Sequence, residues 1–158
     1  MEKERVCNAK RVLLEWVMSL QSLSNEIWFK PFKEGAWGTA DVISHFISWD
    51  RFVIENRIHP LLKGESFPDI QVVADEVNKE ASNYARSGIS KEELLEEFSS
   101  VRKQLLSEIE NIPDSAFRLP YPGNASITLF EYFTGLIQHD ETHKQQIIEF
   151  LQENKVVE

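Results

Sequence analysis

Hydrophobic residues recur every three or four positions along four long stretches of the chain, and polar residues fill the positions between them. This spacing places apolar side chains on one face of an α-helix. The first stretch runs from about Glu4 to Leu23, and the second begins at Thr39. The second is expected to end near His59-Pro60, because the residue before a proline disfavours helical geometry. Alternating patterns typical of β-strands are scarce, so the chain is predicted to be all-α.

Two further helix starts are marked by capping boxes, in which a serine or threonine is followed three residues later by a glutamate. Ser90 and Glu93 form the first box and open a third helix, which Pro113 is expected to end. Thr128 and Glu131 form the second box and open a final helix that runs to about residue 152. These local signals predict where the second half of the chain becomes helical.

The connections between the four helices differ in length. Residues 25–38 contain one proline, two glycines and several aromatic residues and are predicted to form a packed loop. Residues 61–88 form the longest connection, in which either one further helix or a partly ordered crossover fits. Helical spacing there is shown by Ile70, Val73, Val77 and Tyr84. We predict a single domain over residues 1–158, a four-helix bundle with a long crossover between the second and third long helices. Such a crossover allows neighbouring helices to run parallel.

Composition narrows the range of partners. The 158 residues include 17 Lys and Arg against 26 Asp and Glu, a formal net charge of −9. This charge, with no basic stripe, argues against nucleic acid and anionic membrane as partners, because phosphate contacts need clustered cations. No apolar run approaches the ~18–20 residues needed to span a bilayer. Cys7 is the only cysteine and is interpreted as a small core residue of a cytoplasmic protein without disulfides.

The histidines carry the strongest indication of chemistry. His139 and His143 lie four residues apart on the last predicted helix, on the stripe that is expected to face inward. Residues at this spacing stack on one face, so two imidazoles can converge on one ion. His45 occupies an inward position on the second predicted helix. Three imidazoles in one small core are costly unless something satisfies their nitrogens jointly, and a divalent cation does so. His59 lies at a predicted helix end and is excluded.

Blander interpretations stay open for each of these residues. A single buried histidine can be satisfied by hydrogen bonds alone, and pairs at this spacing also arise by chance. Asp41 could hold the second nitrogen of His45, but its favoured role is electrostatic stabilisation of the helix start, where Thr39 is the expected cap. No catalytic side chain is assigned. Packing or solvated roles are expected for Tyr121, Tyr132, Asp140, Glu141 and Glu149.

Two motifs resemble a known family. The segment Trp37-Gly-Thr-Ala-Asp-Val-Ile-Ser-His45-Phe-Ile-Ser-Trp49, together with His139-x-x-x-His143 followed by Gln146-Ile147, resembles the DinB/YfiT-like superfamily. This resemblance implies a bundle that binds a divalent metal, commonly nickel or zinc, through the three matching histidines, and that often forms a homodimer. Residues 68–98 also resemble the ClbS/DfsB-type bundles, which are linked to hydrolytic self-protection against a reactive metabolite.

The resemblance also implies a class of reaction. Some DinB-like proteins are thiol S-transferases that use bacillithiol, mycothiol or a similar thiol. The first expectation is therefore a metal-dependent enzyme that conjugates a low-molecular-weight thiol to a small-molecule electrophile. Three protein ligands leave a coordination position open, as in catalytic rather than structural sites. A metal-dependent hydrolase, using activated water, and a non-enzymatic metal-binding bundle are the alternatives.

Overall fold

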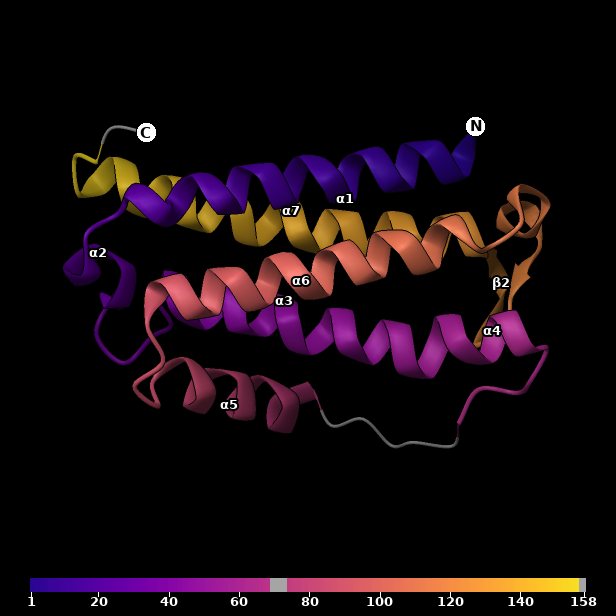
Figure 1. Ribbon diagram of the computed structural model, residues 1–158, viewed down its shortest axis with the longest axis horizontal. Helices are drawn as coiled ribbons and strands as arrows, with labels where there is room; N and C mark the ends of the chain where they lie inside the picture. The colour runs from indigo at the N-terminus through magenta and orange to yellow at the C-terminus, as the bar shows by residue number, and fades with distance from the viewer. Residues whose placement is uncertain (69–73, 157–158) are drawn as a thin grey trace.

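Four long helices form the body of the protein, and the computed structural model describes residues 1–68 and 74–156 (Figure 1). They are α1 (Glu2–Ser19), α3 (Thr39–Val53), α6 (Lys91–Glu110) and α7 (Leu129–Glu153). A 3₁₀ turn, Leu20–Ser22, continues the end of α1. Helix α1 packs on α6 and α7, while α3 packs on α6 and approaches α7 at few positions. The predicted all-α bundle is confirmed.

The direction of the chain in the bundle depends on the long crossover. Helix α3 and helix α6 run the same way and lie side by side, while α1 and α7 run in the opposite direction (Figure 1). Within the crossover, α5 (Ala74–Ala85) packs against α3 on the outside of the bundle. A helix in this connection was one of the two predicted possibilities. Ile70 and Val73, which contributed to that prediction, lie outside the described residues.

The helix starts follow the predicted caps with one correction. The backbone N–H groups of Glu93 and Glu131 donate to the hydroxyls of Ser90 and Thr128, as the capping boxes require. In α3, however, the N-cap is Gly38 rather than Thr39, and Asp41 accepts a hydrogen bond from the Gly38 N–H at 2.8 Å. Glycine stands at this cap because a Cβ there would collide with the carbonyl oxygen of the preceding loop.

The second predicted helix does not end at Pro60. A π-helical turn, Ile54–Ile58, follows α3 and leads directly into α4, His59–Lys63, which ends at Gly64 in the left-handed conformation. Pro60 lies at the start of α4, where the missing backbone N–H costs little. The wider π turn supplies the change in hydrogen bonding that lets helical structure pass through the proline.

A short helix and a β-hairpin were not predicted. Residues Asn25–Phe29 form α2, capped by Ser24, inside the segment predicted to be a loop. Before α7, β1 (Pro120–Tyr121) and β2 (Asn124–Thr128) pair as an antiparallel hairpin. Both elements cover ends of the bundle, where short turns complete its hydrophobic core (Figure 1).

A network of buried charges crosses the core and corrects the prediction that Asp140 is a solvated charge. Lys10 donates to Asp140 at 2.8 Å, and Arg102 donates to Asp140 at 3.3 Å. Arg102 also makes a two-pronged pair with Asp50, at 2.6 and 3.0 Å. Each of the four long helices contributes one member of this network.

Cys7 is buried, as predicted. No helix among the described residues combines the length and apolarity needed to cross a membrane.

Candidate metal centre

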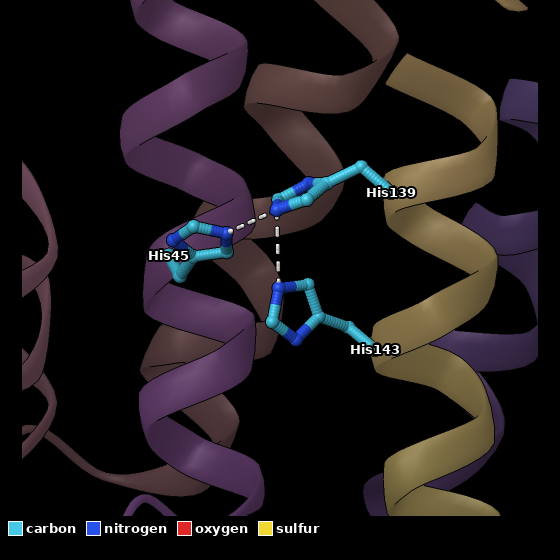
Figure 2. Close-up of side chains that lie close together, drawn as sticks. All are labelled: His45, His139 and His143. Atoms are coloured by element: carbon cyan, nitrogen blue, oxygen red, sulfur yellow. Dashed lines mark hydrogen bonds between the residues drawn. The ribbon is translucent and has the colours of Figure 1, made fainter. Parts of the chain in front are cut away.

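The three predicted histidines meet across the seam between α3 and α7. His45 comes from α3, and His139 and His143 come from successive turns of α7; their rings point into the same gap (Figure 2). The Nε2 atom of His139 lies 3.3 Å from that of His45 and 3.2 Å from that of His143. One nitrogen from each ring lies within 4.8 Å of the others. The excluded His59 instead lies on α4, 3.4 Å from Glu108.

The cluster faces the seam rather than the centre of the core, which corrects the expected inward stripe. His45 is buried, His143 is half-buried and His139 is exposed. Asp140 takes the core-facing position between them, because it lies seven residues from both Phe133 and Ile147, which are buried. The cluster therefore has His45 enclosed by protein on one side and His139 and His143 open to solvent on the other. That is the arrangement expected of a site that accepts a further molecule.

The protonation pattern of His45 follows from its neighbours. Its Nδ1 lies 2.9 Å from the Oδ1 atom of Asn78, a residue of α5. The same Oδ1 accepts a hydrogen bond from the indole N–H of Trp49 at 3.1 Å. Because indole N–H is only a donor, this atom is the amide oxygen, so Nδ1 of His45 must carry the proton. The Nε2 lone pair of His45 is therefore directed at the other two histidines.

His143 is held in a similar way from its own helix. Its Nδ1 lies 2.9 Å from Oε1 of Gln146, which leaves Nε2 to face His139. The indole of Trp37 stacks on His143 with a centroid separation of 6.3 Å and lies 5.2 Å from the ring of His45. Gln146 and Trp37 belong to the motifs that resembled the DinB family, whereas Asn78 was missed. No local pattern links α5 to α3, so only the folded chain reveals that contact.

Asp41 is not the partner of His45. Its carboxylate accepts hydrogen bonds from the Ser82 hydroxyl at 2.6 Å, from Arg86 at 3.0 Å and from the start of α3. These bonds fasten α5 to α3, and so they support Asn78 at a distance. The favoured prediction, a role at the helix start, is confirmed, and the residue also ties the crossover to the bundle.

The electrostatics of the cluster favour neutral rings. Burial, and after it the neighbouring His143 and His139, together lower the pKa of His45 to about 3. Burial and then His143 also lower the pKa of His139. A proton on either ring would lose solvation and face a second imidazole at close range. At neutral pH these two rings therefore present lone pairs, which is the form that binds a metal ion.

The donor set and its spacing fit a transition metal. In a tetrahedral site with metal–nitrogen bonds of about 2.0–2.1 Å, neighbouring nitrogens lie about 3.3–3.4 Å apart. The two short separations at His139 are 3.3 and 3.2 Å. Three imidazole nitrogens suit zinc, nickel or copper, whereas calcium and magnesium prefer oxygen ligands. The three-histidine cluster can hold a divalent ion of the first group.

The remaining side chains considered from sequence do not add a base beside the ring nitrogens. Glu141 and Glu149 are exposed on α7, as expected. Tyr121 and Tyr132 stack on each other with centroids 4.1 Å apart, which supports the packing role. Burial raises the pKa of both hydroxyls. Of the residues considered from sequence, only the three histidines and Trp37 lie at the ring cluster.

Comparison with known proteins agrees with this geometry. Neither the curated proteins nor the solved structures gave a match. The family model described as the DinB superfamily matches residues 10–147, a range that contains His45, His139 and His143, all of α3 and most of α7. This confirms the resemblance drawn from the histidine motifs. The match covers far more than half of the chain, and the protein belongs to the DinB superfamily.

Proposed function

We propose that this protein is a metal-dependent thiol S-transferase, in which His45, His139 and His143 bind one divalent ion. The observation that carries the proposal is the convergence of three Nε2 atoms on a seam that solvent reaches. Three protein ligands leave room for an exogenous ligand. The proposed reaction joins a low-molecular-weight thiol, such as a bacillithiol-like compound, to a small electrophile.

The chain's own part in this reaction is to fix and shield the ligands. Asn78 and Trp49 hold His45 with its Nε2 lone pair available, and Gln146 does the same for His143. Trp37 packs beside both the His45 and the His143 rings. A bound divalent ion supplies Lewis acidity, which favours the deprotonated, nucleophilic form of a thiol. The thiol proton leaves to solvent through the exposed side of His139.

Further properties belong to the same proposal. Nickel or zinc is the proposed metal, because a site of three imidazoles suits both. We propose that residues 1–158 act as one domain, that two copies form a homodimer, and that the protein works in the cytoplasm. The single cysteine is buried, which fits a reducing compartment. Native mass spectrometry of untagged protein, with and without a chelator, tests the metal and the dimer together.

Activity is tested with 1-chloro-2,4-dinitrobenzene and a panel of thiols. In each turnover the thiol sulfur forms a bond to the aromatic carbon, chloride leaves, and the thiol proton passes to solvent. We expect nickel- or zinc-loaded protein to exceed both the metal-free protein and the His139→Ala variant. A rate equal to the metal-free control with every thiol would reject the transferase. Chelator-sensitive cleavage of nitrophenyl esters, without thiol transfer, would replace it with the hydrolase.

A further inference from the structure

A cavity of about 580 Å³ lies directly beside the histidine cluster. It is bounded by the segment 30–38 on one side and by the last turns of α7 on the other, and His143 forms part of its wall. This volume is within the range of small-molecule binding sites. It is therefore large enough for a co-substrate next to the proposed metal position, and too small for a folded partner.

The aromatic walls of the cavity are held in place by the segment 30–38. Phe32 packs against Phe150 of α7 with ring centroids 5.1 Å apart, and Trp37 stacks on His143. The ends of the segment pair through the bridge between Pro31 and Gly38. Backbone hydrogen bonding from Phe32 to the Trp37 carbonyl, at 2.7 Å, closes the same turn. The walls are thus formed before any ligand arrives, and their aromatic rings favour a flat apolar ligand.

The charge at the cavity is negative. Glu149 and Glu153, one turn apart on α7, both line it, and Lys33 is the one cation among the described lining residues. Across residues 1–68 and 74–156, neither glutamate takes part in an ion pair. Helix α7 ends at Glu153 with no basic residue in its last turn. Its carbonyl end therefore adds partial negative charge at the same place.

We propose that this cavity binds the electrophilic co-substrate, and that it selects a flat apolar or aromatic molecule carrying an amine over one carrying a carboxylate. The aromatic walls take the apolar body, and Glu149 and Glu153 attract the cationic group. The cavity wall at His143 places such a molecule next to the thiol. Only the role of the bound molecule as an electrophile rests on the proposed function; the binding preference stands on the cavity itself.

Three probes of one shape test the charge preference: 3-phenylpropylamine, 3-phenylpropanol and 3-phenylpropionate. Binding to the metal-free protein is measured by calorimetry, so the carboxylate cannot gain affinity by coordinating a metal. We expect the amine to bind tightest and the carboxylate weakest, with about 10-fold between them. In Glu149→Gln/Glu153→Gln the three affinities should converge. Glu141→Gln, an exposed charge change on the same helix outside the cavity, should leave the order unchanged.

The outcomes separate this inference from the proposed reaction. Equal affinities for all three probes, the carboxylate binding tightest, or no binding at millimolar concentration would overturn it. A second variant, Phe32→Ala, should weaken all three probes about equally, because it removes apolar wall and no charge. Loss of thiol transfer activity in the assay above, with the amine preference intact, would reject only the transferase. Transfer activity without the charge preference would reject only the assignment of the cavity.

Discussion

Replacing Asp140 by asparagine tests the buried charge network with almost no change in shape. The side chain of Lys10 is only 3% exposed, and that of Asp140 is 9% exposed, at an N–O distance of 2.8 Å. Removing the carboxylate charge leaves a buried ammonium group that has lost its ion-pair partner. Breaking one side of a buried pair costs about 3–5 kcal/mol. Arg102 keeps its paired contact with Asp50, so most of this loss should come from Lys10.

The measurement is urea unfolding of metal-free protein, followed by circular dichroism, in the presence of a chelator. Thermal unfolding gives a second measurement, because for a domain of this size 3–5 kcal/mol corresponds to a fall in Tm of about 6–20 °C, at about 2–4 °C per kcal/mol. Glu141→Gln, the neighbouring exposed residue on the same helix, is the matched control and should change stability by less than about 0.5 kcal/mol. The double variant Lys10→Met/Asp140→Leu should recover most of the loss, because both charges are then removed.

The pH dependence gives this prediction a sign. Burial lowers the pKa of Lys10 below its ordinary value, and the charge of Asp140 opposes that fall. Between the folded and unfolded pKa values the unfolded chain binds more protons, so stability rises with pH in that window. Without Asp140 the folded pKa falls further and the window extends to lower pH. The deficit of Asp140→Asn should therefore shrink as pH rises from neutrality toward 10. A deficit below 1 kcal/mol, or one that grows with pH, would refute the reasoning.

Two further predictions concern the histidine cluster. His139→Ala and His143→Ala should each abolish tight metal binding, whereas His59→Ala should retain it. Elemental analysis after dialysis measures the bound metal. Full metal occupancy in His139→Ala or His143→Ala would contradict the proposed ligand set. Asn78→Ala should lower metal affinity about 10–100-fold by freeing the His45 ring, while Asn83→Ala on the exposed side of the same helix should not. Competition with a chromogenic chelator measures the metal affinity of both asparagine variants. Equal affinities of the two variants would show that Asn78 does not position the His45 ring.

Short-range chemistry made much of the fold predictable. The capping boxes at Ser90 and Thr128 depend on residues three positions apart, so sequence alone locates both helix starts. The rule applied at Pro60 is also local, but a π turn precedes the proline and the chain stays helical past it, which the rule does not anticipate. By contrast, nothing in the local pattern indicates that Asn78 contacts His45, because the two residues lie 33 positions apart.

The meeting of the three histidines was predictable from the sequence, but their orientation in the bundle was less so. A spacing of four residues correctly put His139 and His143 on one side of α7. The same periodic pattern could not decide between positions 139 and 140, which differ by about 100° around the helix axis. Asp140 faces the core and His139 faces the seam. The charge of Asp140 argued for exposure, and only the partners on other helices make its burial tolerable.

The buried network and the histidine cluster are best understood together. Lys10, Asp50, Arg102 and Asp140 come from α1, α3, α6 and α7, one from each long helix. Charged hydrogen bonds tolerate little change in angle or distance, so this network restricts how each helix can rotate or slide. A rotation that keeps Asp140 on Lys10 also keeps the adjacent His139 on the seam. The burial of four charges thus couples the orientation of α7, and with it the side on which His139 and His143 lie, to the other three long helices.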